Sequence, residues 1–133
     1  MADTLKQRPG PMRLIDATQY RLPIAAKLSI LHRASGIIMF VLLPFIIWMF
    51  DKSVSSEISY GEFAAVLASP LAKIVVLGLI WSYLHHFCAG VRHLWMDATH
   101  SVTKEQGKSS AVVSFAISLL LTVALGAKLF GLF

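Results

Sequence analysis

The chain has 133 residues, of which 56% are hydrophobic and only 14% are charged. Soluble domains usually carry about 25% charged residues, whereas three membrane spans of about 20 residues each would take up most of the apolar residues present here. The composition excludes a soluble globular domain, a disordered tail and a disulfide-stapled secreted module. The single cysteine, Cys88, excludes an internal disulfide and a cysteine-ligated zinc or iron–sulfur site within this chain.

Residues 1–23 form a polar N-terminal segment that is rich in basic residues and in the helix breakers proline and glycine. No apolar run of 7–15 residues follows a basic start, so this segment is not predicted to be a signal peptide. Its two acidic residues and few hydroxyl groups also argue against a transit peptide. We expect the segment to lie in the cytoplasm.

Three apolar segments follow, and each predicts a transmembrane helix: 24–50, 71–96 and 111–133. Pro44 lies inside the first span, where a membrane helix tolerates it. Ser69 followed by Pro70 predicts the start of the second helix. Ser109 and Ser110 are the predicted caps of the third helix. The segment 51–69 is predicted to be a polar connection, and residues 24–133 form one all-α membrane domain.

The positions of the basic residues predict the orientation of the chain. Six of the 12 lysines and arginines lie at or before Arg33, and two lie in the loop 97–109. The connection 51–69 carries only one. Because basic loops stay on the cytoplasmic side, we expect the N-terminus inside the cell and the C-terminus outside.

Polar residues inside the second span mark a candidate site, because each is costly at the membrane centre unless it faces a partner or a cofactor. At 100° per residue, three of them, Ser82, His86 and His93, fall near one stripe of the helix, together with Gly90 and with Asp97 just past the span. His85 and Arg92 point away from this stripe. A neutral imidazole is a good axial ligand for haem iron, although His86 could instead hydrogen-bond to a neighbouring helix. Spacing alone does not decide between His85 and His86.

The start of the first span holds a second polar group. Ser29 and Arg33 are neighbours at i, i+4 on a helix, and His32 adjoins them. A hydroxyl beside a guanidinium at the membrane surface can hydrogen-bond a quinone carbonyl. The alternative is that Arg33 and Lys27 only anchor the helix on the basic side of the membrane.

Together these segments resemble the cytochrome b membrane-anchor subunit of succinate dehydrogenase. The resemblance is carried by S-I-L-H-R-A-S-G at 29–36 and by H-x-x-x-G-V-R-H-L-x-x-D at 86–97, with Arg8-Pro9 upstream. The longer R-P-x-S-P-H-L pattern of mitochondrial-type members is missing after Arg8, which favours a bacterial member.

The resemblance implies a heterotetramer of a flavoprotein, an iron–sulfur protein and two membrane anchors, of which this chain is the larger. Succinate would be oxidised on the flavoprotein, so this chain would hold no catalytic residue, and its helices would join a heteromeric bundle in the bacterial inner membrane. His86 matches the axial ligand of a haem b shared with the second anchor. Residues matching the ubiquinone site are Ser29, Arg33 and Asp97, and those matching positions near the haem propionates are His32, Arg92 and His93.

Two alternatives remain open at this point. The chain could anchor a fumarate reductase, which uses related quinone chemistry. It could also be a small membrane adaptor or proton-conducting protein without haem, since histidines titrate near neutral pH and can pass protons. No feature predicts a nucleic-acid partner.

Overall fold

The computed structural model describes residues 10, 11, 13 and 15–133. Arg8 and Pro9, which carry part of the resemblance, lie outside the described residues. The described part is helical and contains no strand; its helices are α1 (Asp16–Gln19), α2 (Ile24–Ser55), α3 (Glu57–Ala68), α4 (Pro70–Thr99) and α5 (Lys104–Leu129). Three of these, α2, α4 and α5, are long and apolar enough to cross a membrane. The prediction of an all-α membrane protein with three spans is therefore confirmed.

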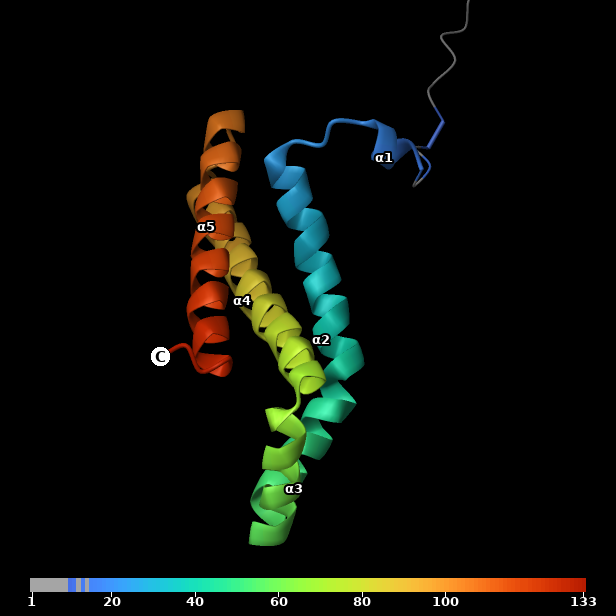
Figure 1. Ribbon diagram of the computed structural model, residues 1–133. Helices are drawn as coiled ribbons and strands as arrows, with labels where there is room; N and C mark the ends of the chain where they lie inside the picture. Colours follow the sequence, from blue (N-terminus) through green and yellow to red (C-terminus); the bar gives the residue numbers. More distant parts are fainter. Residues whose placement is uncertain (1–9, 12, 14) are drawn as a thin grey trace, which may run out of the picture.

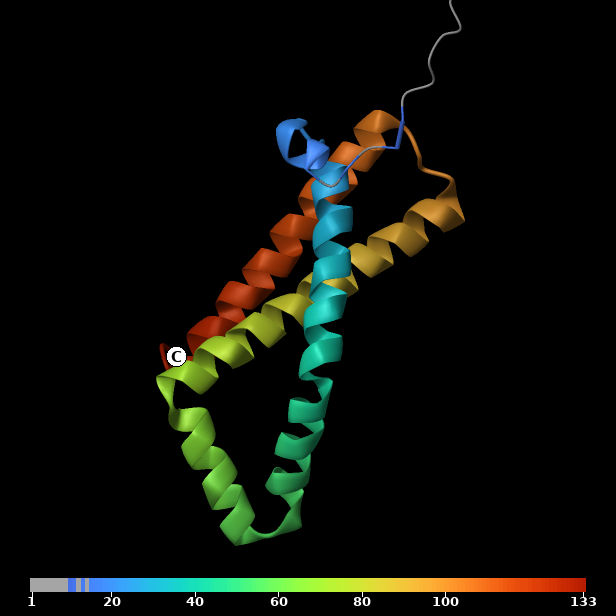
Figure 2. The ribbon, with the colours of Figure 1, turned by 90° about the vertical axis from the view of Figure 1, so that its right-hand side faces the viewer.

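The three long helices form a bundle in which α4 contacts both α2 and α5 (Figure 1). The start of α2 and the connection between α4 and α5 lie at the same end of the bundle, while α3 lies at the opposite end (Figure 2). This arrangement places both polar groups of the sequence near one end: Ser29–Arg33 at the start of α2 and His93–Asp97 near the end of α4.

The segment predicted as a polar connection, 51–69, is mostly helical. α2 continues through Pro44 and five residues past the predicted end of the span, to Ser55. A capping box between Ser56 and Ser59 then starts α3, and Ser59 Oγ donates to the Lys52 carbonyl at 2.8 Å. At about 1.5 Å per residue, α2 is about 48 Å long, so it extends beyond a hydrocarbon layer of about 30 Å.

The starts of the other two long helices differ in how well the sequence predicted them. The prediction for α4 is confirmed: Pro70 lies in its first turn, and Ser69 Oγ accepts from the Ala72 amide. The predicted caps of the third helix are wrong. Thr103 caps α5, because its side chain and that of Gln106 form a reciprocal capping box, and the helix starts at Lys104.

Small residues hold the bundle together. The buried residues of α5 are Ala111, Ser114, Ser118 and Gly126, so this helix packs through a face of small residues. Leu28, Ala89 and Ala111 form the buried cluster where the three long helices meet. Most large apolar side chains are exposed on the isolated chain. This is the pattern of a membrane bundle, in which close backbone approach rather than apolar burial drives helix association.

Candidate functional site

The candidate site lies where α4 crosses α2, and His86 is its centre. His86 Nδ1 lies 2.9 Å from the carbonyl oxygen of His32 and 3.3 Å from the hydroxyl of Ser35. The rings of His86 and His32 are stacked, with centroids 4.0 Å apart and an interplanar angle of 19°. The ring is therefore held by both its edge and its face against α2.

These contacts determine which nitrogen of His86 carries the proton. A carbonyl oxygen can only accept, so Nδ1 must donate to the His32 carbonyl. The one hydroxyl proton of Ser35 is donated to that same carbonyl, at 2.8 Å, so towards His86 the Ser35 oxygen can only accept. A neutral imidazole with a proton on Nδ1 has a free lone pair on Nε2. Nε2 of His86 is thus the nitrogen that can bind a metal.

Gly36 leaves room for this ring. A Cβ at Gly36 would lie 3.0 Å from His86 Cε1 and 3.3 Å from Nδ1, which is closer than side chains normally pack. A Cβ at Gly90 would meet only His32 Nε2, at 3.6 Å, an ordinary contact. Of these two glycines, Gly36 is the one that the position of His86 requires.

The stripe predicted on the second span is confirmed for its central members, since His86, Gly90 and His93 all face His32 on α2. The His93 and His32 rings are 5.4 Å apart between centroids. Asp97 follows one turn later and is exposed near the end of α4. The stripe thus runs from the α2–α4 crossing to the end of the bundle where α2 begins.

His85 faces the other way, as its spacing predicts. It is 1% exposed, and its ring lies between Trp81 of its own helix, at 5.4 Å, and Phe115 of α5, at 5.3 Å. Neither of its ring nitrogens makes a hydrogen bond of full geometry, although the backbone of Leu28 on α2 is close enough to interact with the ring. Enclosed by aromatic rings, His85 has no open face for a large planar group.

Ser29 and Arg33 share one face at the start of α2. Arg33 Nε donates to the Ser29 carbonyl at 3.3 Å, which lays the arginine side chain back over the preceding turn. The Arg33 side chain is exposed, and its terminal nitrogens can donate to a ligand beside the helix. Ser29 and Arg33 lie on α2, the same helix that supports His86.

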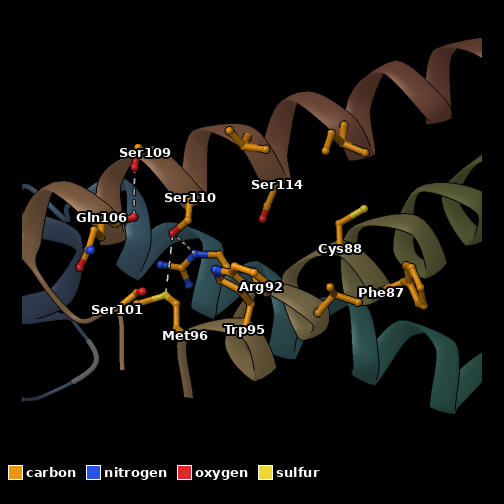
Figure 3. Close-up of a pocket in the computed structure, with 13 residues that line it drawn as sticks. Phe87, Cys88, Arg92, Trp95, Met96, Ser101, Gln106, Ser109, Ser110 and Ser114 are labelled. Carbon is orange, nitrogen blue, oxygen red and sulfur yellow. Dashed lines mark hydrogen bonds between the residues drawn. The ribbon is translucent and has the colours of Figure 1, made fainter. Parts of the chain in front are cut away.

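Arg92 is on the α5 side of α4. It is 7% exposed; its Nε donates to Ser110 Oγ at 2.9 Å and its Nη2 donates to the Gly107 carbonyl at 3.1 Å. Figure 3 shows the guanidinium reaching from α4 towards Ser110. Arg92 lines a groove of about 710 Å³ between α4 and α5, and the rest of the groove wall is mainly apolar. Arg92 therefore connects α4 to the start of α5.

The chemistry open to this site is limited by its donors. Among the described residues no group of three or more histidine, cysteine, aspartate or glutamate side chains could hold a metal ion. A bare ion would lack ligands, whereas a single imidazole nitrogen suits a metal that arrives with most of its coordination already filled.

Sequence reasoning missed Ser35 and Gly36 as parts of this site. Both lie within the segment that carries the resemblance, and a serine–glycine pair one turn after His32 was the available signal. Their contacts with His86 join residues about 50 positions apart, so only the helix crossing reveals them.

Comparison with known proteins identifies the family. Residues 5–125 match the family described as succinate dehydrogenase/fumarate reductase transmembrane subunit. The chain is 31% identical over 113 residues to the succinate dehydrogenase cytochrome b556 subunit of Coxiella burnetii, covering 84% of this chain and 90% of that one. It is 34% identical over 104 residues to the cytochrome b556 subunit of Paracoccus denitrificans, covering 78% and 80%. A mitochondrial cytochrome b560 subunit of Dictyostelium discoideum is 26% identical over 106 residues, covering 79% and 55%. The chain belongs to the family of succinate dehydrogenase/fumarate reductase transmembrane subunits, as a cytochrome b anchor.

Proposed function

We propose that this chain is the larger membrane anchor of a succinate dehydrogenase, binding haem b through His86 and helping to form the site where ubiquinone is reduced. The observation that carries the proposal is the hydrogen bond from His86 Nδ1 to the His32 carbonyl at 2.9 Å. In the neutral imidazole this bond leaves the Nε2 lone pair free, and it holds the ring in one orientation. Metal-binding histidines typically donate their other ring N–H in this way.

The residues of the α2–α4 crossing suit a haem better than a bare metal ion. A haem brings four nitrogen ligands and needs only axial ligands from protein, and His86, whose Nδ1 is bonded to α2, offers its Nε2 at the crossing. A second axial histidine would come from the second anchor subunit. When bound, the haem would supply a one-electron redox centre. His32 and His93, whose rings are 5.4 Å apart, would donate hydrogen bonds to its propionates.

The quinone site would lie at the start of α2. Arg33 would donate from its exposed guanidinium to one quinone carbonyl, and the Ser29 hydroxyl, one turn earlier, would donate to the same headgroup. Asp97, exposed near the end of α4, would line the approach to this site. An arginine fork suits a carbonyl that gains negative charge during reduction, because its donors are fixed in one plane.

The same arrangement indicates partners and orientation. The end of the bundle that carries Ser29, Arg33 and Asp97 would face the cytoplasm, where the iron–sulfur subunit delivers electrons from the flavoprotein. Support comes from the basic residues, of which six of 12 lie at or before Arg33. The membrane would be the bacterial inner membrane, with the second anchor completing the helix bundle.

The predicted contact between Arg92 and a haem propionate can be tested by mutation. Both side-chain hydrogen bonds of Arg92 run to α5, so contact with a propionate would compete with them. We expect Arg92→Met to lower the free energy of unfolding of the complex by about 3–6 kcal/mol, because two charged hydrogen bonds are lost and each is worth about 1.5–3 kcal/mol. We expect the haem spectrum to stay unchanged. Thermal unfolding of the purified complex, with the absorption spectrum of the folded protein, measures both. A changed haem spectrum at unchanged stability would instead place Arg92 at a propionate.

The experiment that tests the function is purification of the intact complex followed by a reduced-minus-oxidised absorption spectrum. We expect a red protein with a low-spin b-type spectrum that reduces ubiquinone with succinate. A colourless complex would favour the adaptor or proton-conducting alternative. A haem-containing complex that oxidises quinol with fumarate much faster than it oxidises succinate would identify a fumarate reductase anchor.

A further inference from the structure

Ser35 is a completely buried serine beside His86, and the function proposed above does not use it. It is 0% exposed and lies one turn after His32 on α2. Its hydroxyl donates to the His32 carbonyl at 2.8 Å, and its oxygen lies 3.3 Å from His86 Nδ1. Two oxygens therefore surround the ring N–H of His86: the Ser35 hydroxyl oxygen and the His32 carbonyl oxygen. The Ser35 hydroxyl is itself hydrogen-bonded to that carbonyl.

The direction of these bonds follows from the single hydroxyl proton. That proton is committed to the carbonyl, so the Ser35 oxygen presents a lone pair to His86. The N–H of His86 is therefore shared between two oxygens held on one turn of α2. Gly36, the next residue, lies so close under the ring that a Cβ would be 3.0 Å from Cε1. Together they leave the imidazole little freedom to rotate.

We propose that Ser35 is a positioning residue that fixes the orientation of the His86 ring and strengthens the bond from His86 Nε2 to the haem iron. This inference rests on the proposed function. Acceptors that bind the ring N–H of a metal ligand raise its basicity, and their loss typically lowers metal affinity by about 10–100-fold. A more basic imidazole stabilises the ferric state more than the ferrous state.

The test is Ser35→Ala in the assembled complex. We expect the affinity for ferric haem to fall by about tenfold, which, if the ferrous affinity is unchanged, corresponds to a rise of about 59 mV in the one-electron midpoint potential. We also expect the g values of the low-spin ferric haem to shift, because they depend on the relative orientation of the axial ring planes. Redox titration and electron paramagnetic resonance measure these two effects.

The chain offers a matched control in Ser118. It is also 0% exposed, and its hydroxyl donates to the carbonyl three residues earlier, Phe115, at 3.1 Å, but it lies on α5. Ser118→Ala should leave the potential and the g values as in the unmodified complex. Ser35→Thr keeps a hydroxyl able to bond the same carbonyl, so its midpoint potential and g values should be close to those of the unmodified complex. If the added methyl disturbs packing, Ser35→Cys provides a weaker donor of similar size.

Two outcomes would overturn the inference: a Ser35→Ala complex with unchanged potential and g values, or equal effects from Ser35→Ala and Ser118→Ala. Complete loss of haem from Ser35→Ala, with Ser118→Ala retaining it and succinate oxidation by an artificial acceptor intact, would support it. His86→Ala tests the proposed function separately: if His86 does not bind haem, this variant keeps the normal haem spectrum. If His86→Ala loses haem while Ser35→Ala is unaffected, only the inference about Ser35 fails.

Discussion

Replacing His86 with alanine is expected to remove the low-spin haem b spectrum from the assembled complex. Nε2 of His86 is the only axial donor that we propose for this chain. Loss of an outer-shell partner lowers metal affinity by roughly 10–100-fold, and loss of the ligand itself lowers it further. The reduced-minus-oxidised spectrum and the haem content per flavin measure the loss. Flavin content and succinate oxidation with an artificial acceptor show whether the complex still assembles.

His85→Phe is the matched control for this experiment. His85 precedes His86 on the same helix, but its ring is 1% exposed and packs between Trp81 and Phe115. Its ring nitrogens make no hydrogen bond of full geometry, so an apolar ring of similar shape removes at most a weak contact with the Leu28 backbone. We expect this variant to keep haem. The ligand assignment would be wrong if His85→Phe lost the haem while His86→Ala retained it.

Replacing Arg33 with alanine is expected to lower ubiquinone reduction by about 10- to 100-fold. A charged hydrogen bond is worth about 1.5–3 kcal/mol, and about 1.4 kcal/mol corresponds to a factor of ten. Arg33 is exposed on α2, one turn after Ser29, so its removal leaves no cavity in the bundle. Oxidation of succinate with an artificial acceptor should remain normal, because that reaction takes place outside this chain.

Lys27→Ala controls for the loss of a positive charge near the same end of α2. Lys27 is also exposed, but it lies six residues earlier and on a different face. We expect quinone reduction to be nearly unchanged in this variant, and Arg33→Lys to recover only part of the activity because lysine lacks the planar fork. Equal losses in Lys27→Ala and Arg33→Ala would show that net charge, and not a specific contact, supports the reaction. Loss of both activities in Arg33→Ala would indicate failed assembly.

Much of the fold could be predicted because membrane spans have strong local patterns. The three long helices follow from apolar runs that must satisfy their own backbone hydrogen bonds in lipid, and the Ser69-Pro70 start of α4 follows from a rule that acts within one turn. The start of α5 was also set by a local signal, the capping box of Thr103 and Gln106. The prediction placed this start too late, because it assigned the caps to the serines next to the apolar run. The helical segment 51–69 was missed because charged residues and serines interrupt its apolar residues, and because it lies beyond the predicted span.

The sequence by itself determined the class of the protein, its three spans, the family motifs on the first two spans and the stripe that carries His86 and His93, because each depends on composition or on helical period. Only the tertiary structure distinguished the surroundings of the two adjacent histidines, His85 and His86. His85 turns towards α5 and is enclosed, whereas His86 lies against α2, where the His32 carbonyl accepts a hydrogen bond from its Nδ1. That choice depends on contacts between residues 54 positions apart, and helical period within one span carries no information about them.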